Sequence, residues 1–352
     1  MKIILWQNII SSLQSYFIRE LSDIYEVVLV VEQQISTERI KQGWKIPNMG
    51  NAKVIVVNND KEVFSFLKSN TDCIHFFSGF TSYPLIKIAF KEIIKTNKVN
   101  IIAESAIQMG WKKHFRFFIY KYYFYKYDKS INFIFAMGDI GVNWYNSIGF
   151  SQEKLINFQY FTELPEAVIY ERNNDKFQLL FIGQLIKRKG VDNLLTAISS
   201  LKNKKFHLTI IGDGILKKDL LRIVKLNNLE NNITFKGNLD NKEAMLFINN
   251  IADCLILPSR FDGWGAVVNE ALSRGVQAIV SDKCGACKMI INNNFGKVYS
   301  ESSISDLVSS IDELIENKSK FDKRMLVKEY NDHFTITPVR RFVKIIEGFY
   351  NK

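Results

Sequence analysis

The chain has 352 residues, of which 47% are hydrophobic and 24% are charged, and at roughly 100–200 residues per domain this length predicts two globular domains. A single small domain and wholesale disorder are excluded. The 47 lysines and arginines outnumber the 36 acidic residues, which gives a net charge of +11 and favours partners that carry phosphate, such as nucleotides, nucleic acid or an anionic membrane.

Short β-branched and aromatic runs alternate along the chain with segments long enough for helices. This alternation predicts βαβ units and two doubly wound parallel sheets, hence an α/β fold. The strands of the first series are expected at Ile3–Trp6, Val27–Val31, Val54–Val57, Ile74–Phe77, Asn100–Ala103 and Phe133–Ala136. Those of the second are expected at Phe177–Ile182, Phe206–Ile211, Ile233–Phe235, Cys254–Leu257 and Gln277–Ser281.

A linker is predicted at Tyr160–Glu166, where periodicity is lost around Pro165. The predicted domains are therefore 1–165 and 166–336. Near the end of the chain, Thr337 is expected to cap a helix over 337–352 with Pro338 at its first position. We expect this helix to pack back on the N-terminal domain through one apolar face, formed by Val339, Phe342, Val343 and Ile346.

The sequence lacks the signatures of several classes of protein. Four cysteines in a chain of this length favour a reducing cytoplasm over a disulfide framework. The N-terminus has no signal-peptide core, and no apolar run is long enough to span a bilayer, so any membrane role is expected to be peripheral. The four histidines are scattered, and Cys284 and Cys287 lack the further ligands of a structural zinc, so no metal site is predicted. P-loop, GxGxxG and GxSxG motifs are absent.

A glycine-rich turn follows the expected strand that ends at Leu257. Gly263 and Gly265 lack a Cβ, so a ligand can approach the backbone there, and helical sequence begins at Ala266. Asp262 can accept a hydrogen bond from a sugar hydroxyl. Glu270, eight residues later, can accept ribose hydroxyls, as the acids of nucleotide-binding folds do. Alternatively, Asp262 is a helix cap and Glu270 a solvated helix residue.

A basic loop follows the expected strand that ends at Ile182. It contains Gly183, Gln184, Lys187, Arg188 and Lys189, and we take Lys189 as the preferred ligand of a diphosphate. Two further glycine turns, at Gly212 and Gly237, also follow strands and are candidates for nucleotide contact, although either could be an ordinary turn.

These motifs, in this order from Phe177 to Ser300, resemble the retaining glycosyltransferases of family 4, which have the GT-B fold of two Rossmann-like domains facing across a cleft. The resemblance implies that Glu270 binds the ribose, that Lys189 and the turn Gly263–Trp264–Gly265 hold the diphosphate, and that Asp262 contacts the donor sugar. It therefore makes Asp262, Glu270 and Lys189 the catalytic candidates. Asp262 replaces the commoner glutamate. Gln184 stands where the family often has arginine, a charge that Arg188 or Lys187 could supply.

The N-terminal half resembles the family more loosely. Its polar residues after expected strands are candidates for binding acceptor hydroxyls, or else are ordinary caps and turns. These acceptor candidates are Gln7, Ser11, Gln14, Ser78 and Glu104.

The segment Trp111–Ser130 has ten aromatic residues and six lysines or arginines among its twenty. Such a mixture suits the headgroup level of an anionic membrane, single-stranded nucleic acid, or an ordinary helix with a buried aromatic face. The family resemblance favours the membrane, because many relatives elongate glycans on polyprenyl diphosphate at the cytoplasmic face.

The sequence thus predicts a retaining, metal-independent glycosyltransferase of the hexosyltransferase type. The donor is expected to be a UDP- or GDP-linked sugar, with no further cofactor and no nucleic-acid partner. The acceptor is expected to be a glycan or a polyprenyl-diphosphate-linked chain in surface polysaccharide (O-antigen or capsule) synthesis, at the inner face of the plasma membrane. The alternatives are a GT-B sugar-nucleotide epimerase or phosphorylase, and a non-catalytic relative that binds membrane or nucleic acid.

Overall fold

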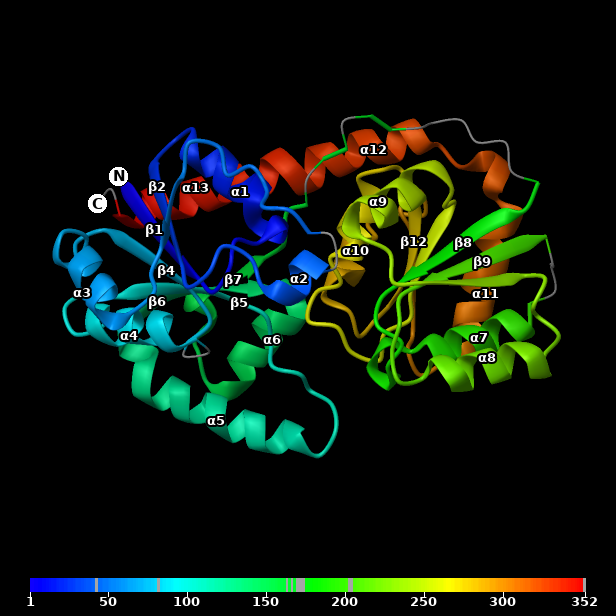
Figure 1. Ribbon diagram of the computed structural model, residues 1–352, viewed down its shortest axis with the longest axis horizontal. Helices are drawn as coiled ribbons and strands as arrows, with labels where there is room; N and C mark the ends of the chain where they lie inside the picture. Colours follow the sequence, from blue (N-terminus) through cyan, green and yellow to red (C-terminus); the bar gives the residue numbers. More distant parts are fainter. Residues whose placement is uncertain are drawn as a thin grey trace. The chain divides into compact units, whose positions relative to one another are not determined.

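The computed structural model describes residues 1–41, 44–80, 83–162, 164–165, 167–168, 175–201 and 205–350. The chain divides into two compact units (Figure 1). The first comprises Met1–Lys41, Lys45–Glu163 and Pro338–Lys352, and the second comprises Gln42–Trp44 and Leu164–Thr337. Positions 163 and 166 of the expected linker lie outside the described residues, whereas Pro165 lies within them.

The first unit contains a seven-stranded parallel sheet with strand order β3-β2-β1-β4-β5-β6-β7. Strand β1 is central: Leu5 lies opposite Leu29 of β2 and Phe76 of β4. The strands are β1 (Lys2–Gln7), β2 (Glu26–Val31), β3 (Lys53–Val56), β4 (Ile74–Ser78), β5 (Val99–Ala103), β6 (Ile131–Met137) and β7 (Leu155–Phe158). Most residues of the central strands are buried, as expected when helices cover both faces of a sheet.

The helices of this unit lie on both faces of its sheet. Helix α1 is on one face, and α4, α5 and α6 are on the other (Figure 1). Their bounds are α1 (Ser12–Ser22), α2 (Thr37–Lys41), α3 (Asp60–Lys68), α4 (Pro84–Ile93), α5 (Lys112–Tyr127) and α6 (Gly138–Ile148).

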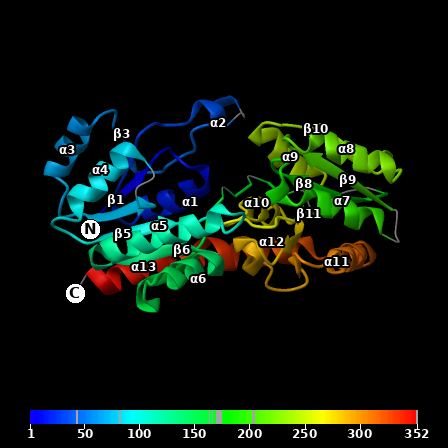
Figure 2. The same cartoon turned by 90° about the horizontal axis from the view of Figure 1, so that it is seen from below.

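The second unit contains a six-stranded parallel sheet with strand order β10-β9-β8-β11-β12-β13. Its strands are β8 (Phe177–Ile182), β9 (Phe206–Ile211), β10 (Ile233–Gly237), β11 (Cys254–Leu257), β12 (Gln277–Ser281) and β13 (Gly296–Tyr299). Helices α7 and α8 cover one face, and α9 and α10 the other (Figures 1 and 2). The helices are α7 (Val191–Ser199), α8 (Lys217–Leu226), α9 (Asn241–Asn250), α10 (Val267–Leu272), α11 (Ile304–Glu316) and α12 (Lys323–Asn331).

The predicted α/β fold with two doubly wound parallel sheets is confirmed. The last strand of each sheet, β7 and β13, was not predicted. Asn157 interrupts the apolar residues of β7, and β13 begins with glycine and lysine, so neither shows the continuous apolar run of a buried strand.

The end of the chain corrects one expectation. Thr337 does not cap a new helix: its backbone is helical, and a π-helical turn, Asp332–Ile336, joins α12 directly to α13 (Thr337–Tyr350). A wider turn ahead of Pro338 accommodates a residue that lacks an N–H and would clash with the carbonyl four residues earlier. Of the four residues of the predicted apolar face of α13, Val339, Phe342 and Ile346 are buried and Val343 is half-buried. Phe342 packs against Phe17 of α1 at 4.8 Å between ring centroids.

Within the described residues, no helix is both long enough and apolar enough to cross a membrane.

Candidate functional site

The order of strands in the second unit defines a crossover point between β8 and β11. Strands β9 and β10 lie on one side of β8, and β12 and β13 lie beyond β11. In open parallel sheets, ligands bind beyond the carboxyl ends of the strands at such a point. Here the segment after β8 carries Gly183 to Lys189, and the segment after β11 carries Arg260 to Gly265. The topology therefore brings together the two motifs that sequence analysis selected.

An ion pair joins these two segments. The Lys189 ammonium lies 2.6 Å from Oδ2 of Asp262, and the two side chains are only 16% and 13% exposed. Alongside it, the Arg188 guanidinium donates to the carbonyl of Phe261 at 3.1 Å, and the Arg260 N–H donates to the carbonyl of Arg188 at 2.8 Å. The predicted phosphate ligand and the predicted sugar contact are thus direct neighbours.

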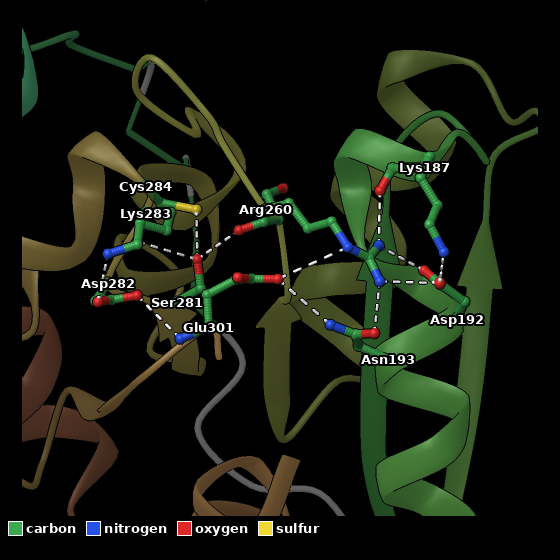
Figure 3. Close-up of polar contacts among 10 residues, drawn as sticks. Lys187, Asp192, Asn193, Arg260, Ser281, Asp282, Lys283, Cys284 and Glu301 are labelled. Carbon is green, nitrogen blue, oxygen red and sulfur yellow. Dashed lines mark hydrogen bonds and ion pairs between the residues drawn. The ribbon is translucent and has the colours of Figure 1, made fainter. Parts of the chain in front are cut away.

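Arg260, which was not among the predicted site residues, also joins the same two segments (Figure 3). Its guanidinium donates to both carboxylate oxygens of Asp192 at 2.7 and 2.9 Å, and to the carbonyl of Lys187 at 2.7 Å. It also donates to Oδ1 of Asn193. The paired cations hold the pKa of Asp192 below its usual range against the effect of burial. A bidentate fork of this kind fixes geometry as well as charge.

Lys187 belongs to this supporting network, because its ammonium lies 2.6 Å from Asp192 (Figure 3). Of the two side chains that could replace the charge missing at Gln184, that of Arg188 bonds the segment carrying Asp262, at the carbonyl of Phe261, whereas that of Lys187 bonds Asp192. Gln184 itself is exposed.

Glu270 lines a cavity of about 270 Å³, together with Gly183, Gly212 and Asn238. Its carboxylate is half-buried, and no hydrogen bond or ion pair to it is found among the described residues. The Arg274 guanidinium donates instead to the backbone carbonyl of Glu270 at 3.0 Å. Burial raises the pKa of Glu270 to about 7, and the nearby charge of Arg274 only partly opposes this. A half-buried carboxylate that faces a cavity and has no hydrogen-bond partner among the described residues is poised for a ligand that donates hydrogen bonds.

The glycine turns bring the ends of β8, β9 and β10 close together. The Gly212 N–H donates to the carbonyl of Gly237 at 2.7 Å, and the Gly183 N–H donates to the carbonyl of Ile211 at 3.0 Å. A Cβ on Gly212 would lie 2.0 Å from the carbonyl oxygen of Gly183, and the φ of Gly212 is +134°. Only glycine fits there, so the floor of the cavity depends on this residue.

The turn after β11 is supported from within. Trp264 is buried, and its indole N–H donates to Oδ1 of Asn269 at 2.7 Å. Gly263 and Gly265 are buried beside it. Trp264 and Asn269 therefore hold the turn in shape. In the sequence, the role of Asn269 is indicated only by its position immediately before Glu270.

Cys284 is part of the same framework. Its backbone forms a bridge with Asp262, and its buried thiol contacts the Ser281 hydroxyl at 3.4 Å (Figure 3). Burial raises the pKa of this thiol to about 12, so it is an unreactive packing residue. In the described part of the chain, no group of three or more His, Cys, Asp or Glu side chains could hold a metal.

The first unit has its own crossover point, between β1 and β4. A cavity of about 440 Å³ lies there and brings together all five acceptor candidates. These are Gln7, Ser11, Gln14, Ser78 and Glu104. The cavity is also lined by Arg39, Tyr83, Tyr120 and Tyr160, which sequence analysis missed because they come from separate helices and loops.

Two residues that line this cavity carry a buried polar atom with no hydrogen-bond partner among the described residues. The Gln7 amide donates to Oε1 of Gln14, but Oε1 of Gln7 and the Ser105 hydroxyl have no such partner. The Tyr160 hydroxyl donates to Glu104 at 2.8 Å, and burial and the nearby Glu104 charge hold the pKa of Tyr160 well above its usual value. Buried polar atoms without partners in a polar cavity indicate a ligand rich in hydroxyls.

Comparison with known proteins agrees with this geometry. Residues 166–332 match the family model "Glycosyl transferases group 1". An uncharacterised glycosyltransferase of Methanocaldococcus jannaschii is 31% identical over 153 residues, which are 44% of this chain and 42% of that protein. An uncharacterised 41.2 kDa protein in the cps region of Klebsiella pneumoniae is 26% identical over 270 residues, 71% of each chain. The chain spans less than half the length of the archaeal relative.

Solved structures extend the likeness in fold to the first unit. The apo form of the lipopolysaccharide outer core galactosyltransferase WaaB covers 99% of both chains with a TM-score of 0.73 and 16% identity. The Anabaena protein HepE in complex with UDP-glucose covers 99% of this chain and 100% of its own, with a TM-score of 0.72 and 13% identity. Residues 166–332 are therefore similar to the glycosyl transferases group 1 domain, and the chain has the GT-B fold of two Rossmann-like units.

Proposed function

We propose that the protein transfers a sugar from a nucleotide diphosphate donor to a glycan or lipid-linked acceptor, with retention of anomeric configuration and without a metal ion. The observation that carries the proposal is the pairing of Lys189 with Asp262 at the crossover point of the second sheet, where the half-buried carboxylate of Glu270 also lines a cavity. A cation, a sugar-binding carboxylate and a ribose-binding carboxylate are the groups that a sugar nucleotide requires.

In this proposal, Glu270 accepts hydrogen bonds from the ribose hydroxyls and the diphosphate lies against Lys189. Negative charge grows on the diphosphate as the bond to the sugar breaks. Lys189, supported by Arg188, stabilises that charge without reorganising, because both side chains are already held by the segment after β11. Asp262 then accepts a hydrogen bond from a hydroxyl of the donor sugar and fixes its orientation.

The acceptor is proposed to bind in the cavity of the first unit, where Gln7 and Ser105 offer unpaired polar atoms. We propose a role in surface polysaccharide assembly at the cytoplasmic face of the plasma membrane. This is supported by the Klebsiella relative, which is encoded in a cps region, and by the likeness to a lipopolysaccharide galactosyltransferase. The likeness to HepE, solved with UDP-glucose, makes UDP the first nucleotide to test.

The first experiment is calorimetry of UDP, GDP, ADP, CMP and their sugar conjugates with the full chain in the presence of EDTA. We expect one nucleotide to bind, and we expect Glu270→Ala to weaken its binding by about ten- to a hundredfold, the value of one hydrogen bond to a charged group. Glu316→Ala, at an exposed position of α11, is the matched control.

The second experiment identifies the reaction with the nucleotide sugar that binds. Proton NMR of the product is expected to show the anomeric configuration of the donor. Turnover of the donor without an acceptor would indicate an epimerase. No binding by any nucleotide would overturn the proposal in favour of a non-catalytic protein.

A further inference from the structure

Helix α5 carries aromatic side chains on two faces. Five pack into the core of the first unit, and these are Phe117, Tyr120, Tyr123, Phe124 and Tyr127. The other five are exposed, and these are Trp111 (80%), Phe115 (65%), Phe118 (69%), Tyr122 (55%) and Tyr125 (89%). The inner face packs the helix onto its unit, whereas the outer rings are exposed to solvent.

The exposed rings form one continuous stripe. They follow each other at intervals of four, three, four and three residues, the spacing that places side chains on one side of a helix. The 16 residues of α5 extend over about 24 Å at 1.5 Å per residue. We call Trp111, Phe115, Phe118, Tyr122 and Tyr125 the aromatic stripe.

The stripe points away from the rest of its unit. On its inner side, α5 packs over the helices that cover the sheet: Tyr127 contacts Phe90 of α4 at 5.1 Å, and Tyr120 contacts Trp144 of α6 at 5.6 Å between ring centroids. Figure 1 shows α5 at the lower edge of the first unit, with α4 and α6 between it and the sheet. Contiguous exposed aromatic surface of this kind marks an interaction site.

The charged side chains of α5 itself are all basic, and the acidic Asp128 in the turn after it is paired with Lys154. Lys112, Lys113, Lys121, Lys126 and Lys129 are exposed on α5 and the turn after it. The sequence contains no acidic residue between Glu104 and Asp128. Two of these lysines lie over stripe rings: Lys112 is 5.4 Å from the Trp111 ring centroid, and Lys126 is 5.5 Å from that of Tyr122. The surface that meets this face must therefore be apolar in its interior and anionic at its edge.

From this combination we infer that the aromatic stripe docks on an anionic lipid bilayer, with α5 parallel to the membrane plane. Aromatic rings are favoured at the depth of the headgroups, and lysines can bury their stems there while the ammonium groups meet lipid phosphates. A second copy of the chain fits less well, since it would bring two sets of lysines together. This inference rests on the proposed function, because docking would bring the chain to a lipid-linked acceptor. Docking itself needs no donor and can be measured without the reaction.

The test is sedimentation of the full chain with vesicles of phosphatidylcholine that contain increasing phosphatidylglycerol. We expect binding that rises with anionic lipid and falls with salt. The triple variant Trp111→Ser, Phe118→Ser, Tyr125→Ser and the double variant Lys113→Glu, Lys121→Glu are each expected to weaken binding at least about tenfold. The matched control, Ile24→Ser with Leu226→Ser, removes apolar side chains that are 53% and 72% exposed elsewhere, and should bind like the wild type.

Circular dichroism and calorimetry with UDP keep the outcomes distinct. A stripe variant that keeps its fold and its UDP affinity but loses vesicle binding supports the inference, whether or not the proposed transfer reaction is found. Absence of vesicle binding by the wild type would overturn it. So would unchanged vesicle binding by the triple variant. Two other results would also overturn it: a dimer in solution that the triple variant dissociates, and a single-stranded oligonucleotide that binds the stripe more tightly than vesicles do.

Discussion

Lys189 and Asp262 neutralise each other across the crossover point of the second sheet, with the ammonium 2.6 Å from the carboxylate. In the proposed reaction, the diphosphate must therefore share Lys189 with Asp262. The two residues are expected to have opposite effects on nucleotide affinity.

The first prediction follows from this competition. Lys189→Ala should weaken UDP binding about ten- to a hundredfold, because a charge-assisted hydrogen bond is lost. It should weaken UMP, which lacks the second phosphate, much less. Asp262→Asn removes the competing carboxylate, so UDP should bind slightly more tightly while sugar transfer falls. Lys187→Ala, which removes an exposed partner of Asp192, is the control. Calorimetry with both nucleotides decides, and equal losses for UDP and UMP would refute a diphosphate role for Lys189.

Arg260 gives a prediction about stability. Arg260→Lys keeps the charge but cannot form the fork to Asp192 together with the bond to the carbonyl of Lys187. We expect the free energy of unfolding to fall by about 1.5–3 kcal/mol, and UDP affinity to fall as the two segments separate. Lys283→Ala, which breaks only an exposed pair with Asp282, should change stability little. Urea denaturation compares the three proteins, and a neutral Arg260→Lys would show that the fork is dispensable.

The sequence is enough to place two motifs at strand ends of the second unit, because each motif is local. Gly183 to Lys189 and Asp262 to Glu270 each lie within one turn and its adjoining helix, so spacing along the chain determines their arrangement. Arg260 contacts residues about 70 positions earlier, and Tyr160 reaches Glu104, 56 positions away. Pairings of that kind are set by strand order, which periodicity does not reveal. For the segment Trp111–Ser130, the sequence does not show which aromatic side chains are buried. The packing of α5 shows that five are in the core and five are exposed.

A third prediction concerns the cavity floor. Gly212→Ala places a methyl group 2.0 Å from the carbonyl oxygen of Gly183 and is expected to destabilise the chain by about 2–4 kcal/mol and to abolish UDP binding. Gly237 also has a positive φ, of +70°, but a Cβ there would meet nothing within 4 Å. Gly237→Ala is therefore expected to lower the free energy of unfolding by only about 1–2 kcal/mol. Thermal unfolding with and without UDP measures both effects. Equal stability losses would mean that backbone strain, and not the close approach, makes Gly212 necessary.

The acceptor cavity gives a fourth prediction. Gln7→Leu keeps the side-chain volume. It removes the hydrogen bond from the Gln7 amide to Gln14, and it removes Oε1, which has no partner among the described residues. We expect the KM for the acceptor to rise about five- to tenfold, the value of one hydrogen bond, while calorimetric affinity for UDP is unchanged. Gln152→Leu, at an exposed position of the same unit, should alter neither. A loss of UDP affinity in Gln7→Leu would place this residue outside an acceptor site.

The last prediction is a pH dependence caused by Glu270. Burial raises its pKa from 4.5 to about 7, so the folded chain retains this proton to a higher pH than the unfolded chain does. Folded stability should therefore fall as pH rises from about 4.5 to about 7. Donor affinity should do the opposite, because the ionised carboxylate is the better acceptor for ribose hydroxyls.

UDP-glucose is the suitable probe for this pH dependence, since its phosphates do not titrate near neutrality as the terminal phosphate of UDP does. We expect its affinity to rise up to about tenfold per pH unit below 7, and to level off above it. Glu270→Gln should bind UDP-glucose more weakly, with an affinity that does not rise with pH. The stability of this variant should not fall between about pH 4.5 and 7. If the variant kept the wild-type slope, another group would be responsible, and Glu270 would not be the carboxylate that receives the ribose.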